Sequence, residues 1–161
     1  MLDPQLVSGV ELRIKTCDYN LSLGENRYSM LEEAVGDYVS FVDDDDLVSP
    51  NYVSSILPLL GDVDYVGFQL QLFIDGRAEK PTYHSLEYEE WYEDSEGFYR
   101  DISHLNPIKR EIALQVPMSG NLGEDSRWAS GLRNKQLVKT EKYIDDIMYF
   151  YYWRSNKKDG V

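Results

Sequence analysis

The residues best suited to chemistry are four consecutive aspartates, at positions 43–46, which directly follow an apolar run at positions 38–42. Like charges this close repel, so four carboxylates stay ionised together only when a cation lies among them. Clustered carboxylate oxygens are the ligands that Mg²⁺ and Mn²⁺ prefer. On an extended segment Asp43 and Asp45 would point to the same side and converge on one ion. The block therefore indicates a divalent-cation site.

Two other interpretations of the aspartates stay open. A run of like charge is usually a solvated surface, so the block can be an acidic loop in which Asp46 caps the next helix. It can also belong to an acidic divalent-cation-binding module that acts as an interaction protein, with the aspartates serving only the structure. An EF-hand is excluded, because its loop needs Gly at the sixth position and Glu at the twelfth, where this chain has Val48 and Ser54.

The aspartates need a strand to carry them and helices to flank them. Alternating apolar and polar residues predict a half-buried strand over 10–16, and a helix over 25–35 follows, with Gly36 as its C-terminal stop. The apolar run at 38–42 predicts a buried strand, and the strand–helix–strand order predicts a right-handed parallel crossover. Ser49-Pro50 then begins a second helix that continues to about residue 60.

The rest of the chain adds further strands and helices. The patterns predict a long strand over 64–74, a turn at Asp75-Gly76 with a returning strand, helices over 109–116 and 123–132, and a β-rich aromatic segment over 144–153. The acidic residues 85–98 predict a loop with a short helix. Together these elements give an α/β fold with a mixed sheet.

Composition limits the class of protein. The chain has 161 residues and a net charge of −13, which suits one domain and argues against nucleic acid or an anionic membrane as partner, because phosphate-rich surfaces need a basic face. Apolar residues make up 42% of the chain, too many for an acidic disordered tail. A lone Cys17, the lack of a signal-type N-terminus and the lack of an apolar run of about 18 residues lead us to expect a cytoplasmic protein without a transmembrane segment.

The segments around the aspartates resemble one known family. Residues 24–27 (GENR), 34–46 (AVGDYVSFVDDDD) and 50–53 (PNYV) are similar to the middle of inverting glycosyltransferases of family 2, which have the GT-A fold. Weaker likeness continues through 104–107 (HLNP), 123–125 (GED) with Trp128, and 149–154 (YFYYWR). The resemblance implies a GT-A-like α/β fold of the nucleotide-diphospho-sugar transferases, a mixed sheet flanked by helices.

The resemblance also implies a donor site. Asp43 and Asp45 would form the Asp-x-Asp pair that holds a divalent cation, Mn²⁺ or Mg²⁺. Asp43, Asp44 and Arg27 would contact the nucleoside-diphosphate sugar donor. A cation makes physical sense here, because an acidic protein holds an anionic diphosphate only when the charges of both are neutralised. The guanidinium near a helix start favours phosphate as well.

An acceptor site follows from the same likeness. Inversion needs a general base for the acceptor hydroxyl, and the Gly-Glu-Asp segment resembles the family's acidic motif, so Asp125 would be the base and Glu124 the alternative. Trp128 would offer an apolar platform to the acceptor. His84 and His104 are lone histidines without ligand spacing, and we expect both to be structural or solvent-facing.

Structural alternatives stay open for these charged residues. Charge pairing alone allows Arg27 to be a surface residue that pairs with Glu25 or Glu32. Glu124 and Asp125 can simply favour the positive end of the helix that begins there, because acids are common in a first helical turn.

The predicted function is therefore a metal-dependent glycosyltransferase that moves a sugar from a nucleoside-diphosphate donor to a glycan, lipid or protein hydroxyl with inversion. Residues 1–161 would form one domain, with residues 1–80 as the donor and metal half and 81–161 as the acceptor half. The family's first strand, helix and second strand, about 60 residues that hold the nucleotide base, have no counterpart here. We therefore expect an N-terminally truncated fold, whose alternative is a non-catalytic remnant, and an exposed sheet edge that allows a homo-oligomer.

Overall fold

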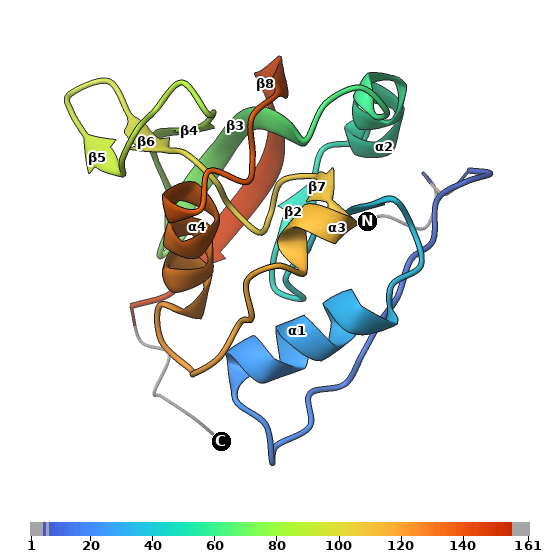
Figure 1. The fold of residues 1–161 in the computed structure, drawn as a ribbon. Coiled ribbons are helices and arrows are strands. Elements are labelled where there is room, and N and C mark those ends of the chain that lie inside the picture. The colour runs from blue at the N-terminus through green and yellow to red at the C-terminus, as the bar shows by residue number, and fades with distance from the viewer. Residues whose placement is uncertain (1–4, 6, 156–161) are drawn as a thin grey trace.

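The computed structural model describes residue 5 and residues 7–155 of the chain (Figure 1). The helices are α1 (Leu23–Glu33), α2 (Tyr52–Ile56), the 3-10 turn η2 (Leu57–Leu59), α3 (Arg110–Ala113) and α4 (Glu124–Asn134). The strands are β1 (Tyr38–Val39), β2 (Leu47–Val48), β3 (Tyr65–Ile74), β4 (Arg77–His84), β5 (Tyr92–Glu93), β6 (Phe98–Arg100), β7 (Ile108–Lys109) and β8 (Glu141–Trp153).

One mixed sheet joins these strands, and β3 lies at its centre. Strand β3 runs antiparallel to β4 and parallel to β8, and β8 runs antiparallel to β2. On the other side β4 runs parallel to β6, which pairs with β5. The short β7 pairs with the first residue of β3 and with β1. The sequence-based fold class, a mixed sheet flanked by helices, is confirmed.

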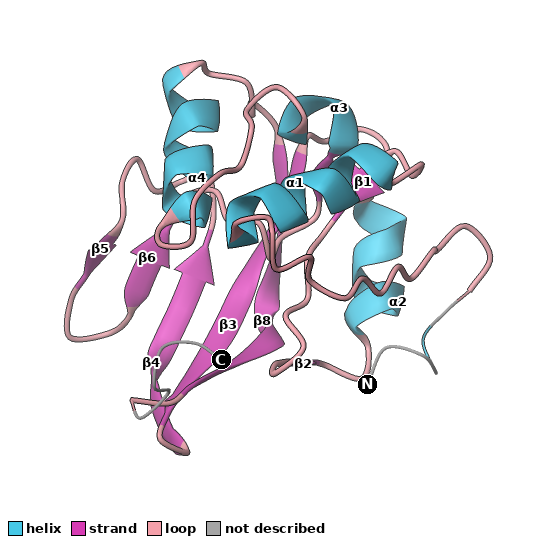
Figure 2. Ribbon diagram, turned by 90° about the horizontal axis from the view of Figure 1, so that it is seen from below, coloured by secondary structure: helices cyan, strands magenta, loops and turns pink. Residues whose placement is uncertain are grey.

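Two hydrophobic clusters hold the helices to this sheet. Figure 2 shows α1, α3 and α4 gathered at one end of β3. There Tyr65, the first residue of β3, is fully buried among side chains of these helices, including Leu31 and Trp128. The second cluster packs α2 against β3 and β8 through Tyr52, Phe68 and other apolar residues. The first cluster is the one that fixes the positions of α1 and α4.

Several predicted elements are confirmed with small shifts. Ser22 caps α1: its Oγ accepts from the Glu25 N–H at 3.3 Å, and the Glu25 carboxylate accepts from the Ser22 N–H at 2.7 Å. The cap places the start of α1 two residues earlier than expected, and the helix ends at Glu33 before Gly36 is reached. The long strand β3, helix α4 and strand β8 lie where the patterns place them. Asp75 and Gly76 form the turn with φ angles of 49° and 80°.

The predicted strand over 10–16 is wrong, and with it the parallel crossover. Residues 10–16 form no strand in the structure, and Ile14 in their middle is 88% exposed. Strand β1 instead pairs antiparallel with β7, which comes from far downstream in the chain. An alternating pattern of apolar and polar residues becomes a strand only where a neighbouring strand accepts its backbone hydrogen bonds. Among the residues that the structure describes, 10–16 have no such neighbour, because β1 pairs with β7 instead.

Other boundaries also differ from the sequence-based expectation. The buried strand expected over 38–42 is confined to two residues, because beyond Val39 the backbone turns to the loop before β7, where the Phe41 N–H donates to the His104 carbonyl at 3.0 Å. The short helix expected within 85–98 is absent, and β5 and β6 form a hairpin there. Helices over 50–60 and 109–116 form, but as the short α2 with η2 and the short α3. No helix in the described part of the chain is long and apolar enough to cross a membrane.

Candidate active site

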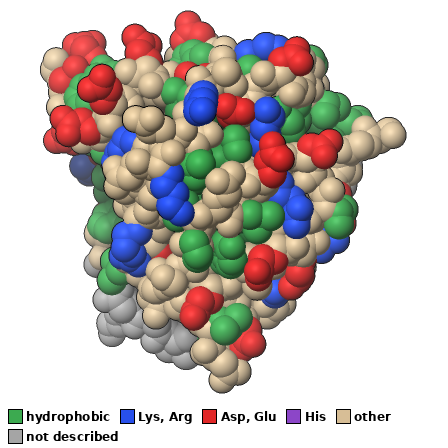
Figure 3. Space-filling view, in the orientation of Figure 1, with side chains coloured by type: hydrophobic (Ala, Val, Ile, Leu, Met, Phe, Trp, Pro, Cys, Tyr) green, Lys and Arg blue, Asp and Glu red, His purple; other side chains and the backbone are tan. Residues whose placement is uncertain are grey.

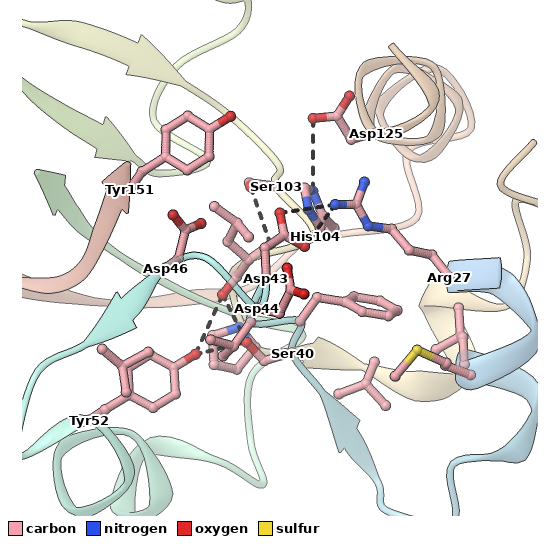
Figure 4. Close-up of a pocket in the computed structure, with 18 of the residues that line it drawn as sticks. Arg27, Ser40, Asp43, Asp44, Asp46, Tyr52, Ser103, His104, Asp125 and Tyr151 are labelled. Carbon is pink, nitrogen blue, oxygen red and sulfur yellow. Dashed lines mark hydrogen bonds and ion pairs between the residues drawn. The ribbon is translucent and has the colours of Figure 1, made fainter. Parts of the chain in front are cut away.

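An open groove with a volume of about 1710 Å³ contains the aspartate block and the acidic start of α4. Four segments meet there: α1, the segment after β1, the loop before β7, and the first turn of α4. In Figure 4, Arg27 from α1 and Asp125 from α4 reach toward Asp43 and His104. These segments are far apart in sequence, so the site exists only in the folded chain.

Arg27 joins two of these segments. Its Nη2 donates to Asp43 Oδ1 at 2.8 Å and to Oδ2 at 3.0 Å, and its Nη1 donates to the carboxylate of Glu124. Burial disfavours the charge, yet Asp43 and Glu124 together raise the pKa of Arg27 above its usual value. Arg27 does not pair with Glu25 or Glu32 on its own helix, and Glu25 instead takes part in the helix cap with Ser22. Arg27 therefore faces the groove.

The four aspartates form a turn, so the extended arrangement expected for them is wrong. The Asp46 N–H donates to the Asp43 carbonyl at 3.1 Å, an i to i+3 bond that curls the block. Successive side chains therefore point in different directions. Asp43 is half-buried, Asp44 and Asp45 are exposed, and Asp46 is buried.

Asp46 anchors this turn to β8. Its carboxylate accepts from the Tyr149 hydroxyl and from the Tyr152 N–H, both at 2.8 Å. The Tyr149 oxygen in turn accepts from the Asp43 N–H at 3.1 Å. Burial raises the pKa of Asp46 to about 6 although both donors act to lower it. Asp46 does not cap α2, whose N-cap is Asn51, and its place is structural.

The two acids that begin α4 have different surroundings. The preceding Gly123 has a φ of 63°, a conformation that glycine adopts without strain. Successive residues of an α-helix point in different directions, so Glu124 and Asp125 face different surroundings. Glu124 is buried at its ion pair with Arg27. The side chain of Asp125 is 35% exposed and lines the groove. Of the two, Asp125 is the one that a substrate can reach.

Both histidines are buried, but only one has partners. His84 Nδ1 lies 2.6 Å from the Asn106 side-chain oxygen, which fits a structural histidine. His104 lines the groove, and neither of its ring nitrogens has a hydrogen-bond partner. Its Nδ1 lies 3.9 Å from Asp125 Oδ2, too far for a hydrogen bond. Burial and the charge of Arg27 lower the pKa of His104 to about 4. Sequence reasoning did not place His104 in the site: the weak likeness over 104–107 includes it, but a lone histidine has no ligand spacing that indicates a role.

Several aromatic side chains line the groove, and Trp91 is one of them, whereas Trp128 is not. Trp128 is 1% exposed in the core and its Nε1 donates to the Ala113 carbonyl at 3.1 Å, so the expected acceptor platform does not lie there. Trp91 lines the groove, and its Nε1 donates to Asp101 at 2.8 Å while the Arg100 guanidinium lies 4.5 Å from its ring centre. Figure 3 shows acidic side chains gathered where β5 and β6 lie. Apart from the buried Asp101, the acidic residues between positions 85 and 101 are exposed to solvent.

The carboxylates at the groove fit a cation that takes some of its ligands from the protein and the others from a substrate. Among the residues described, no group of three or more Asp, Glu, His or Cys side chains is placed to hold a metal ion alone. Magnesium is commonly bound by one or two carboxylates together with substrate phosphates. The aspartate turn offers such carboxylates at the groove, and Asp43 is already held in position by Arg27.

Comparisons with known proteins agree with this architecture. The structure is similar to residues 1–349 of S. aureus TarS, crystallised in complex with UDP-GlcNAc, with a TM-score of 0.62 and 15% sequence identity. The match covers 87% of this chain and 42% of that chain, so this chain spans less than half of the TarS structure. No curated protein matches the sequence. The family model "Glycosyl transferase family 2" matches residues 4–121, which is most of the chain, and we conclude that the chain belongs to glycosyl transferase family 2.

Proposed function

We propose that this protein is a metal-dependent glycosyltransferase that moves a sugar from a nucleoside-diphosphate donor to an acceptor hydroxyl with inversion. The observation that carries the proposal is the placement of Asp125 beside the Asp43–Arg27 pair in one groove. Asp125 can accept a proton, and the Asp43–Arg27 pair can hold a metal and a diphosphate. Family membership supports glycosyl transfer as the chemistry of this site.

On the donor side, Asp43 and Asp45 would hold Mn²⁺ or Mg²⁺, and Asp44 would lie beside the nucleotide. When bound, the cation neutralises the diphosphate and stabilises it as a leaving group. Arg27 would then serve three anions, because its guanidinium, which already pairs with Asp43 and Glu124, has further N–H donors for a phosphate. A UDP-sugar is the first donor to test, since TarS was crystallised with UDP-GlcNAc.

On the acceptor side, Asp125 would take the proton of the attacking hydroxyl. The hydroxyl oxygen forms a bond to the anomeric carbon while the bond from that carbon to the diphosphate oxygen breaks on the opposite face. One displacement of this kind inverts the anomeric configuration, and the proton ends on Asp125. A hydroxyl of a glycan, a lipid or a protein meets this requirement.

Calorimetry with MnCl₂, UDP and a panel of UDP-sugars tests the proposal. We expect UDP to bind with Mn²⁺ and not with EDTA, and Asp43→Asn and Asp45→Asn to weaken binding at least tenfold. Glu90→Gln, which removes an exposed acid of the β5–β6 region, should bind as the parent does. If Asp45→Asn binds as well as the parent, the metal assignment is wrong.

Two results would favour other functions. Binding of Mn²⁺ without any nucleotide binding would favour a cation-binding interaction module. Metal-dependent UDP-sugar binding without UDP release, whatever acceptor is offered, would favour a non-catalytic member of the family.

A further inference from the structure

His104 is a buried polar side chain that lines the groove, and its ring has no hydrogen-bond partner in the described structure. It is 7% exposed, and among the described residues its two ring nitrogens are the buried side-chain polar atoms that lack a hydrogen bond. Burying such atoms without partners costs free energy. A side chain of this kind indicates a ligand that supplies the missing partner.

The structure holds this imidazole firmly. The His104 carbonyl accepts from the Phe41 N–H at 3.0 Å, and the next carbonyl, of Leu105, accepts from the Ser40 hydroxyl at 2.8 Å. The Phe41 ring lies against the imidazole, with 6.0 Å between the ring centres. The loop before β7 is therefore fastened to the segment that leads into the aspartate turn, and His104 is fixed relative to Asp43.

The distance from His104 to Asp125 fits one bridging oxygen. His104 Nδ1 and Asp125 Oδ2 are 3.9 Å apart. An oxygen about 2.8 Å from each atom would complete two hydrogen bonds, with an angle of roughly 90° at the oxygen. Because Nδ1 is enclosed by protein, the oxygen gains its place when the partly exposed Asp125 side chain shifts to admit it. Figure 4 shows the two side chains facing each other across this gap. The burial of His104 and the positive charge of Arg27 both favour the uncharged imidazole, which carries one N–H donor.

We propose that His104 binds the acceptor hydroxyl together with Asp125. The imidazole N–H donates to the hydroxyl oxygen, and the hydroxyl donates its own proton to the Asp125 carboxylate. When the oxygen attacks the donor sugar, that proton passes to Asp125, and His104 keeps its proton and stays neutral. The inference rests on the proposed function and deepens it, because the pair selects a neutral hydroxyl and rejects an ammonium group, which has no lone pair to accept the imidazole proton.

Three variants test the role of His104. His104→Leu removes both nitrogens at a similar volume, and His104→Asn keeps a polar group near the position of Nδ1. His84→Leu is the matched control, because His84 is the second buried histidine and has a hydrogen-bond partner. Each variant is compared with the parent for melting temperature, for UDP affinity with Mn²⁺, and for UDP release from the UDP-sugar that binds the parent, with methyl hexosides and water as acceptors.

We expect His104→Leu to melt at or above the temperature of the parent, since it removes unpaired buried nitrogens. Its UDP affinity should stay within twofold, while UDP release falls at least tenfold and His104→Asn restores part of the rate. His84→Leu should melt at a lower temperature than the parent.

Two outcomes would overturn the inference on its own. One is that His104→Leu loses as much melting temperature as His84→Leu, which would make the role structural. The other is that a parent active in transfer releases UDP no faster than His104→Leu. If the parent binds no UDP-sugar at all, the proposed function fails, and the role of His104 fails with it.

Discussion

The guanidinium of Arg27 holds the carboxylate of Asp43, with Nη2 at 2.8 Å from Oδ1 and 3.0 Å from Oδ2. The same side chain also pairs with Glu124 at the start of α4. The Arg27 guanidinium thus joins α1, the aspartate turn and α4. Without substrate this arrangement balances two carboxylates, and in the proposed function the same charge would lie beside the diphosphate of the donor. Under this proposal, stability and donor binding would both depend on Arg27.

Replacing Arg27 should destabilise the protein strongly. Arg27→Gln leaves the Asp43 and Glu124 carboxylates unpaired, and the Glu124 side chain is only 5% exposed. We expect a loss of about 3 kcal/mol in the free energy of unfolding, measured by urea denaturation at pH 7. The control is Arg13→Gln, whose pair with Glu11 is exposed and should be worth less than about 1 kcal/mol. Equal losses for the two variants would contradict the role of Arg27.

Replacing Asp125 should stop transfer and leave the fold intact. Asp125→Asn removes a partly exposed carboxylate without a buried ion pair, so the melting temperature should change little. UDP release should fall by about 10²–10⁴-fold at unchanged UDP affinity, the range for loss of a general base. Glu124→Gln is the comparison, since it breaks the ion pair with Arg27 and should lower the melting temperature. If folded Glu124→Gln is inactive and Asp125→Asn is active, Glu124 is the base.

Replacing Trp128 should affect stability and not acceptor binding. Trp128→Phe leaves a cavity in the core and removes the donor to the Ala113 carbonyl. We expect a loss of about 2 kcal/mol in unfolding free energy. UDP release measured well below the melting temperature should stay at the rate of the parent. A raised KM for the acceptor at unchanged stability would contradict this prediction and show that Trp128 contributes to acceptor binding.

Acid should destabilise the protein through its buried histidines. Burial lowers the pKa of His84 to about 4, although the Asn106 side chain acts to raise it, whereas an unfolded chain titrates near pH 6.5. As the pH falls from about 6.5 to 4, the unfolded chain gains a proton that the folded chain cannot hold, so stability present above pH 6.5 is lost. The loss through His84 should be about 2–3 kcal/mol over this range.

The pH dependence is checked by urea denaturation at several pH values. His84→Gln should lose less stability than the parent between pH 6.5 and pH 4, even though it is less stable at pH 7 because the bond to Asn106 is changed. The same slope in both proteins would mean that His84 is protonated in the folded state.

Strand β1 leads us to expect self-association. In the described part of the chain β1 pairs with β7 on one side and has no strand on the other. An open edge of this kind can accept a strand of a second copy. Sedimentation over a hundredfold range of concentration should show a mass that rises with concentration, and Val39→Lys should reduce it. A monomer mass at every concentration would contradict the prediction.

Local patterns were enough to predict most of the elements. The apolar run of β3, the Asp75-Gly76 turn and the amphipathic α4 depend on neighbouring residues, so their sequence specifies them. The segment over 10–16 has equally clear alternation and forms no strand. A strand needs hydrogen-bonding partners from elsewhere in the chain, and the pattern of one segment does not contain them.

The candidate site, like the fold, was predicted only in part from the sequence. The sequence by itself determined the acidic block, the Gly-Glu-Asp segment and, through them, the family. Only the tertiary structure decided that Asp125 faces the groove while Glu124 pairs with Arg27, that Asp46 is an anchor, that Trp128 lies in the core, and that His104 lies beside Asp125. The physical reason is that residue type and spacing fix local charge and periodicity, whereas partners and burial depend on contacts between segments distant in the chain.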